Sequence, residues 1–311
     1  KRKMKKNKLK NISGVTLVEI LIGIAVSALM VTAMFTTYNV VNNSYTQVTD
    51  RAKISRSGRD VVAMLMRDIR LAGYKFYMGA NTLGISKGDN LTYESGEEDV
   101  RISHDPIIIV YNELNYTPWD QGPRIPEAKT DKTNDKCCDK IHITYGDFDH
   151  TDVNQPYKRY KITYYAKPRG KELDNIYYGI YRTKETWIED GIIETPYWSS
   201  TCDECYHEEL LRDHLDDMEF VAFNKHGKNL FIAAENGFPR PDKASKTKLY
   251  NIRIVDVRLT FRSKNFFYRF KAKEGSPRVI KALSDRTQKF TDRFLRDAVV
   301  VTVHTRNIGT Y

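Results

Sequence analysis

Apolar residues dominate one continuous stretch near the start of the chain. Over the 21 residues from Val15 to Phe35, Glu19 is the only charged group, and the other clearly polar positions carry hydroxyls. A helix of this length rises about 30 Å, which matches the hydrocarbon core of a bilayer. The pattern therefore predicts a transmembrane helix over residues 15–35. A buried helix of a soluble core is the alternative, and the length of the stretch disfavours it.

Beyond Phe35 the pattern becomes that of an amphipathic helix. Between Lys53 and Tyr74 apolar residues recur at three- and four-residue steps, which places them on one helix face. They are Ile54, Val61, Met64, Leu65, Ile69 and Ala72. Gly73 fits a C-terminal cap, and Gly58 is a point at which the helix could kink. We expect one helix of about 55–60 residues, whose half over 36–74 packs under a head.

Short runs of β-branched and aromatic residues predict a β-rich head over residues 75–311. The expected strands are 107–111, 140–145, 157–166, 175–183, 218–224, 229–233, 250–262 and 298–305. The predicted fold class is α+β, with the long N-terminal helix packed against an antiparallel β-sheet.

Three local features of the head are also predicted. In 250–262 the apolar positions change face near Val255, which indicates a β-bulge. Arg253, Arg258 and Arg262 are expected on solvated faces, because arginine is usually exposed. The segment 264–296 is expected to be mixed loop and short helix.

The charge of the chain is concentrated in its first residues. The formal net charge is +10, and residues 1–14 carry seven basic and no acidic side chains, which leaves +3 for residues 15–311. Basic residues before an apolar span favour a cytoplasmic N-terminus and an exported head. We expect no nucleic-acid partner, because no clustered basic stripe is evident outside the leader.

Glu19 is not explained by a simple membrane anchor. An ionised carboxylate within a bilayer normally has a partner and a function, unless it lies shallow enough to stay hydrated by headgroups. A free α-amino group at Val15 would lie four residues earlier on the same helix face. That amine would exist only if the chain were cut after Gly14.

The sequence GVTLVE (residues 14–19), after a basic leader and before an apolar helix, resembles the class III signal of type IV pilins and type II secretion pseudopilins. The resemblance implies that residues 1–14 are a leader cleaved after Gly14 and that Val15 becomes N-methylated. It implies that Glu19 pairs with the N-terminal amine of a neighbouring subunit during assembly. Prepilin peptidase, the inner membrane and the pilus assembly platform are the implied partners.

Two further stretches resemble large minor subunits of these filaments. LMRDIRLAGY (65–74) and RDAVVVTVHTRNIG (296–309) are similar to the helix end and closing strand of PilW-type minor pilins and GspJ-type pseudopilins. The hypothesis is a minor pilin that primes or caps assembly at the pilus tip, with other minor pilins and the major pilin as partners. Its implied route runs from the inner membrane through the periplasm to the extracellular pilus. A type II secretion pseudopilin and a tip adhesin or DNA-binding module are the alternatives.

Cys137, Cys138, Cys202 and Cys205 are candidates for disulfides, because an exported head occupies an oxidising compartment. A bridge between the adjacent pair would be strained across a trans peptide, with Cα atoms about 3.8 Å apart. We therefore expect bridges between the two segments, worth about 4 kcal/mol in the chain-entropy model. Zinc held by the cysteines with His142 or His207 is the rival, although adjacent cysteines are poor co-ligands. Free thiols are the remaining alternative.

No pattern in the chain predicts catalysis. Residues 146–154 offer a weak calcium site at Asp147, Asp149, Asp152 and Asn154, but their spacing fails the EF-hand pattern and a solvated loop is favoured. Nucleophile, metalloprotease and phosphate-loop motifs are absent from the sequence. We therefore expect no enzyme activity and no cofactor.

Overall fold

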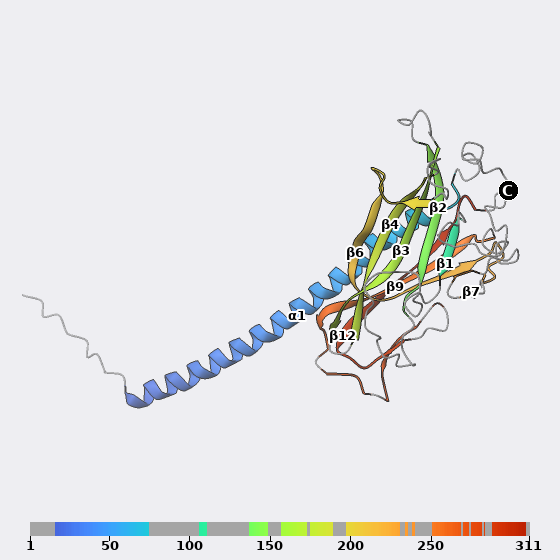
Figure 1. Ribbon diagram of the computed structural model, residues 1–311. Helices are drawn as coiled ribbons and strands as arrows, with labels where there is room; N and C mark the ends of the chain where they lie inside the picture. The colour runs from blue at the N-terminus through green and yellow to red at the C-terminus, as the bar shows by residue number, and fades with distance from the viewer. Residues whose placement is uncertain are drawn as a thin grey trace, which may run out of the picture. The chain divides into compact units, whose positions relative to one another are not determined.

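The fold is α+β, as predicted, with a long N-terminal helix and an antiparallel β-sheet (Figure 1). The computed structural model describes residues 16–74, 106–110, 137–148, 157–172, 175–188, 197–230, 234–235, 238–239 and 251–308 without 269, 274, 282 and 284–287.

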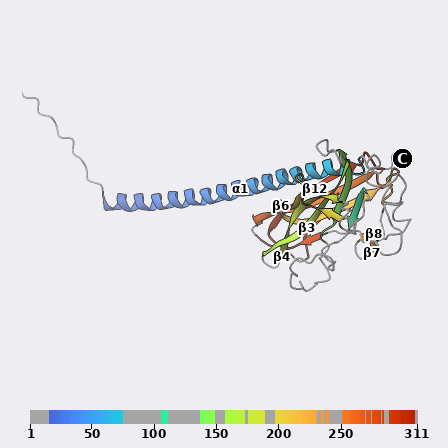
Figure 2. The ribbon, with the colours of Figure 1, turned by 45° about the horizontal axis from the view of Figure 1, so that its top comes forward.

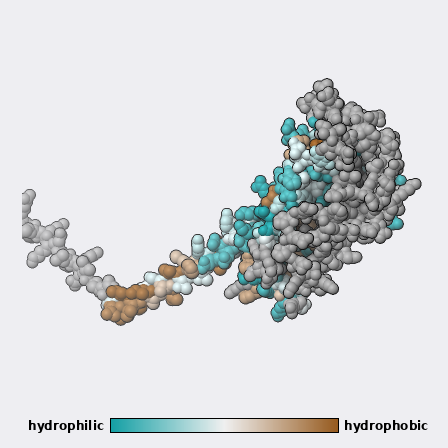
Figure 3. All heavy atoms as spheres, in the orientation of Figure 1, coloured by the Kyte–Doolittle hydropathy of each residue, from teal (hydrophilic) through white to brown (hydrophobic). Residues whose placement is uncertain are grey.

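Helix α1 runs without a break from Leu17 to Leu71, which is 55 residues. The chain divides into two compact units, and the second begins at Asp50 within this helix. The large apolar side chains of α1 from Leu17 to Val48 are exposed, and the most apolar residues gather near its beginning (Figure 3). By length and composition this helix could cross a membrane.

The main sheet has eight strands, all paired antiparallel, in the order β1-β2-β3-β4-β6-β9-β12, with β5 paired to β4. These strands are β1 (Ile107–Val110), β2 (Lys140–Phe148), β3 (Tyr157–Glu172), β4 (Asn175–Ile188), β5 (Tyr197–Ser199), β6 (Tyr206–Phe223), β9 (Ile254–Phe266) and β12 (Phe294–His304). Two small hairpins complete the described strands: β7 (Ala234–Glu235) with β8 (Phe238–Pro239), and β10 (Arg278–Ile280) with β11 (Gln288–Phe290).

Several boundaries differ from the predicted ones. Strand β6 begins twelve residues before the expected Met218, because its first half carries charged, exposed side chains that hide the strand pattern. The expected strand 229–233 contributes an isolated bridge between Asn229 and Phe223, and residues 231–233 lie outside the described residues. The described part of 264–296 contains the β10–β11 hairpin and the start of β12 rather than a short helix.

The predicted bulge near Val255 is wrong. Strand β9 begins at Ile254, so Ile252 precedes the strand and its change of face requires no bulge. Its pairing with β6 and β12 is regular from Ile254 to Thr260. The register shifts lie instead between Leu215 and Asp217 of β6, and between Phe294 and Arg296 of β12.

The second half of α1 packs on one face of the sheet (Figure 2). The predicted apolar stripe is buried as expected. Five of its residues are each at most 4% exposed: Ile54, Val61, Leu65, Ile69 and Ala72. Each large aliphatic side chain buried in this way stabilises the fold by roughly 1.5–3 kcal/mol. Met64 is only half-buried, and Val62 takes its place in the core.

Gly58 serves close packing, since α1 passes through it without a break. A Cβ atom at this position would lie 3.0 Å from Val299 Cγ2 and 3.4 Å from two ring carbons of Phe261. The absence of a side chain therefore lets α1 approach β9 and β12.

The C-terminal end of α1 is held by hydrogen bonds to two segments of the head that are far apart in the sequence. Gly73 has a φ of +72°, as expected for a C-terminal cap, and its N–H donates to the carbonyl of Thr144 in β2 (2.9 Å). Asn307 Nδ2 donates to the carbonyl of Arg70 in the last turn (3.0 Å). Because Val299 lies at Gly58 and Asn307 at Arg70, β12 runs along α1 in the same direction.

Candidate functional site

Glu19 belongs to a capping box at the start of α1. The Thr16 N–H donates to Glu19 Oε2 (2.8 Å), and the Thr16 hydroxyl donates to the same oxygen (3.0 Å). In return the Glu19 N–H donates to Thr16 Oγ1 (3.3 Å). This reciprocal pattern satisfies backbone donors that a helix start otherwise leaves without partners. Gly14 and Val15, the predicted cleavage and methylation residues, lie outside the described residues.

The capping box was readable in the sequence and was missed. Thr16 and Glu19 have the T-x-x-E spacing of such a box, directly before an apolar helix. Both hydrogen bonds to the carboxylate end on Oε2, and among the described residues Oε1 accepts none. One oxygen of Glu19 is therefore bound within the helix start, while the other is open to a cation.

The surroundings of Glu19 are apolar and exposed. Glu19 is the only charged residue between positions 17 and 49. Its neighbours Leu17, Val18, Ile20 and Leu21 are 53–74% exposed. A lone carboxylate on such a surface would be costly to bury without a counter-charge.

A second polar site joins α1 to the sheet. Asp68 is 1% exposed although it lies on the apolar stripe of α1. The Tyr164 hydroxyl of β3 donates to Asp68 Oδ2 (2.6 Å), and Arg182 Nη1 of β4 lies 3.6 Å from the same oxygen. Arg182 also donates from Nη2 to Glu209 of β6 (2.8 Å). We call Asp68, Tyr164, Arg182 and Glu209 the helix–sheet network.

The tyrosines around Asp68 resist ionisation. Burial raises the pKa of Tyr164 well above its ordinary value of 10.0, and the negative charge of Asp68 raises it further. Burial and the charge of Asp68 raise the pKa of Tyr145 in the same way. Burial likewise raises the pKa of Tyr206 to about 12.

These shifts predict alkaline unfolding. Below pH 10 the phenols are neutral in both states, so their contribution to stability is constant. Above pH 10 the unfolded phenols ionise while the folded ones stay protonated, so the free energy of unfolding falls as pH rises. Tyr145 and Tyr164 should each contribute a loss of about 1.4 kcal/mol per pH unit. Urea unfolding between pH 9 and 11.5 measures the slope. Tyr164→Phe should reduce the slope by the share of one tyrosine, and an unchanged slope would contradict this origin.

A third polar group occupies the opposite face of the sheet. Arg258 of β9 is 1% exposed, and it binds Asp217 Oδ2 and Glu219 Oε2 of β6, the latter at 2.8 Å. Arg262, also 1% exposed, lies 3.9 Å from Asp216, and Arg296 of β12 donates a hydrogen bond to the same carboxylate. The prediction that Arg258 and Arg262 are solvated is wrong, because carboxylates of the adjacent strand β6 lie next to both guanidinium groups. Arg253 is half-buried.

The structure pairs Cys137 with Cys138 and Cys202 with Cys205, so the expected bridges between the two segments are wrong. Asp139, beside the first pair, donates its N–H to Met218 of β6, while Cys205 directly precedes Tyr206 at the other end of that strand. The intervening residues of β6 span roughly 40 Å of strand, whereas a disulfide needs Cα atoms within about 7 Å.

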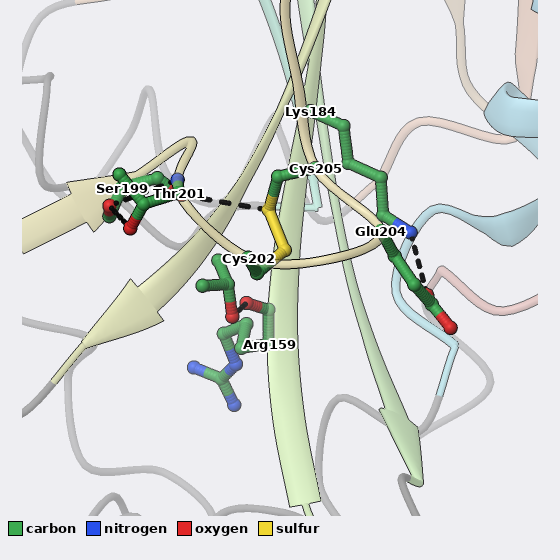
Figure 4. The surroundings of a disulfide bond; sticks show 8 residues. Arg159, Lys184, Ser199, Thr201, Cys202, Glu204 and Cys205 are labelled. Carbon is green, nitrogen blue, oxygen red and sulfur yellow. Dashed lines mark hydrogen bonds and ion pairs between the residues drawn. A yellow bond between two sulfur atoms is a disulfide. The ribbon is translucent and has the colours of Figure 1, made fainter.

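Each disulfide has a distinct environment. Cys202–Cys205 lies in the turn between β5 and β6, where Cys205 Sγ is 3.7 Å from the Ser199 carbonyl and Lys184 pairs with Glu204 at 3.1 Å (Figure 4). Cys137 and Cys138 are buried in the core next to β2.

The described residues that were candidates for a zinc or calcium site do not come together around one point. The four cysteines do not converge, His142 hydrogen-bonds Thr163 Oγ1 (2.9 Å), and His207 is an exposed residue of β6. Sulfurs of Cys137 and Cys138 lie within 4.8 Å of an Asp217 oxygen, but the sulfurs are bonded to each other and Asp217 binds Arg258. Of the calcium candidates, Asp147 lies in β2, and Asp149, Asp152 and Asn154 lie outside the described residues.

The structure is similar to that of a type IV-like pilin, TTHA1219 from Thermus thermophilus, with a TM-score of 0.39 and 8% sequence identity. The similarity covers 82% of this chain and 98% of that chain. No protein-family model and no curated protein sequence matches the chain. A likeness at this TM-score is not evidence of a function.

Proposed function

We propose that this chain is a minor subunit of a type IV pilus, of the PilW type. It is inserted in the inner membrane, cut after Gly14, and incorporated at or near the pilus tip, where it primes or caps assembly. The observation that carries the proposal is Glu19, the single charged residue of α1 between positions 17 and 49, placed five residues after the expected cut.

The geometry of Glu19 supports an assembly role. Thr16 holds the carboxylate through Oε2 and thereby fixes its position at the helix start. In a filament core of low dielectric, the amine of Val15 on an arriving subunit would need a negative partner, and an unpaired charge there costs several kcal/mol. Glu19 supplies that charge, and its second oxygen is directed to no other described residue.

The surface of α1 supports helix packing beyond the membrane. Tyr38, Val41, Tyr45 and Val48 follow the predicted span at three- and four-residue steps and are 59–71% exposed. A surface of this kind on a helix already longer than a bilayer requires is suited to burial against other helices.

Three substitutions at the helix start test the proposal in cells that assemble pili. Glu19→Gln keeps a capping-box side chain but removes the charge, Glu19→Ala removes both, and Thr16→Ala removes the box but keeps the charge. We expect all three to be inserted and cleaved. Both Glu19 variants should fall more than about tenfold in filament incorporation, because the loss exceeds 1.4 kcal/mol. Thr16→Ala should be affected less.

The measurement is the amount of each variant in sheared filaments relative to the membrane fraction. Ser27→Ala is the matched control, since among the described residues the Ser27 hydroxyl donates a hydrogen bond only to the Gly23 carbonyl of its own helix (2.7 Å). Wild-type incorporation of both Glu19 variants would refute the assembly role. Co-purification with type II secretion pseudopilins in place of pilus subunits would reassign the chain to the GspJ-type role.

A further inference from the structure

The two edges of the main sheet differ in their exposure. Strand β1 forms one edge, and all four of its residues are buried. Strand β12 forms the other edge, and Val300, Thr302 and His304 on it are exposed. The sheet is therefore open to solvent along the later residues of β12.

Backbone groups of alternate β12 residues point away from the sheet. The Thr305 N–H donates to the Arg253 carbonyl (2.9 Å), in register with the pairing of β9 and β12. In an antiparallel pair, residues that bond to one neighbour alternate with residues that face the other side. Those that face outward are Ala298, Val300, Thr302 and His304. Among the described residues, none of their N–H and C=O groups has a hydrogen-bond partner. We call the outward backbone of 298–304 the β12 edge.

The β12 edge lacks the features that normally keep another strand from pairing with an open sheet. Those features are lysine, proline and β-bulges. Residues 297–304 contain no lysine or proline, and the described register shift of β12 lies before Arg296. In contrast, the part of β6 that extends past β9 has positive φ angles at Glu208 (50°) and His214 (63°) and register shifts against β4. The β12 edge is therefore suited to receive another strand.

Two arginines of α1 point toward the β12 edge. Helix α1 lies along β12. Asp68 points toward the middle of the sheet, where it binds side chains of β3 and β4. Arg59 and Arg70 lie nine and two residues from Asp68 in the sequence. Because each residue turns the helix by about 100°, both arginines point within about 20° of the opposite direction. That direction is toward the β12 edge.

The positive charge beside the β12 edge is not neutralised. Arg59 and Arg70 are exposed, as is Arg306, two residues after the end of β12. Arg59 donates to the Ser55 hydroxyl of its own helix (3.1 Å). Within the described ranges, none of the three arginines pairs with a carboxylate. Asp297 is the one acid in residues 297–306, so positive charge is in excess.

These features determine what kind of molecule fits the β12 edge. Another extended polypeptide satisfies both the N–H and the C=O groups, whereas phosphates could satisfy only the N–H donors. A second copy of this chain would bring the same three arginines against one another, and like charges across a strand pair are destabilising. An acidic strand would instead form charge-assisted hydrogen bonds with them.

We propose that the β12 edge binds an extended acidic segment of another filament subunit, which adds to the sheet as an antiparallel strand. Antiparallel addition continues the pattern of every described pair in the sheet. The acidic side chains of the segment lie on the α1 face, toward Arg59 and Arg70. Its other side chains lie on the opposite face, beside Val300 and Thr302. The source of the segment, a filament subunit, rests on the proposed function.

Synthetic peptides of about ten alternating valine and glutamate residues test the edge itself. Directly opposed residues of an antiparallel pair share a face, so the residues that bond to Val300 and its outward neighbours must be the valines. N-methylation of the valines should therefore abolish saturable binding to the full chain in detergent. N-methylation of the glutamates, which keeps the same charge and composition, should change the affinity by less than about twofold. Fluorescence anisotropy of the labelled peptides measures the binding.

Substitutions in the chain test the contribution of the arginines. Arg59→Gln combined with Arg70→Gln should weaken binding of the valine–glutamate peptide about fivefold or more. Lys53→Gln is the matched control, since Lys53 is exposed on α1 but points within about 60° of Asp68, away from the β12 edge. It should weaken binding less than about twofold. The proposal is overturned by the absence of saturable binding up to about 1 mM, or by equal binding of the two N-methylated peptides.

Cross-linking in assembled filaments tests the source of the segment. A photoreactive benzoylphenylalanine introduced at position 300 should join this chain to an acid-rich segment of a pilus subunit, identified by peptide mapping. Cross-links only to a second copy of this chain, or to no pilus subunit, would overturn the proposal. Absence of the chain from filaments would contradict the proposed function and the named source with it. The peptide measurements need no filament, so they decide separately whether the β12 edge binds an acidic strand.

Discussion

Replacing Asp68 by alanine should lower the free energy of unfolding of the head by about 3 kcal/mol, because the substitution leaves buried polar groups without their partner. Asp68 is 1% exposed, and its Oδ2 accepts a hydrogen bond from Tyr164 at 2.6 Å with Arg182 Nη1 at 3.6 Å. Urea unfolding of the full chain in detergent measures the change. Asp60→Ala is the matched control, since Asp60 lies on the same helix but is exposed, and it should change stability by less than about 0.5 kcal/mol.

A double-mutant cycle assigns the loss to the helix–sheet network. Asp68→Ala and Tyr164→Phe should be coupled by about 1–2 kcal/mol, because both remove the same hydrogen bond. Asp68→Ala should also raise the rate of amide hydrogen exchange in residues 61–71, where α1 packs on the sheet. Two results would mean that Asp68 does not hold the helix on the sheet. One is additive losses in the free energy of unfolding, and the other is amide exchange that becomes faster by the same factor throughout the head.

Arg258→Met should destabilise the head by about 3–5 kcal/mol, the larger of the two effects. Arg258, Asp217 and Glu219 are each at most 1% exposed, and removing the arginine leaves two carboxylates buried without their counter-charge. Methionine keeps much of the volume, so the loss reports on charge more than on packing. The measurement is again urea unfolding, with the exposed Arg59→Met as control.

Neutralising the two carboxylates provides the decisive comparison. The triple variant Arg258→Met, Asp217→Asn, Glu219→Gln should recover at least about 2 kcal/mol of the loss, because no uncompensated charge remains in the sheet. If the triple variant is less stable than Arg258→Met alone, the carboxylates stabilise the head through other partners and the charge explanation is wrong.

Hydrophobic periodicity was sufficient to predict α1 and most of the sheet. The three- and four-residue steps from Ile54 to Ala72 identified the buried face, because burial of apolar area dominates helix packing. The same periodicity could not assign Gly58 and Asp68 to that face, although they continue its spacing. A glycine or a carboxylate on a core stripe depends on partners elsewhere in the chain, and Tyr164 lies 96 residues from Asp68.

Buried charge was the main feature that sequence patterns could not predict. Arg258 was expected in solvent because arginine usually is, but it pairs with carboxylates 39 and 41 residues earlier, on a strand whose charged first half concealed its extent. The cysteine pairing failed for a related reason, since the two segments meet β6 at opposite ends. The capping box of Thr16 and Glu19, in contrast, is local and could have been found from spacing alone.

The mass of the N-terminal peptide tests the central claim most directly. The chain should be purified from membranes of cells with an active prepilin peptidase and from cells in which that peptidase is inactive. With the active enzyme, we predict an N-terminal peptide that begins at N-methylated Val15, and Gly14→Val should block its formation. With the inactive enzyme, residues 1–14 should remain attached. Recovery of the intact leader from cells with the active peptidase would contradict the account.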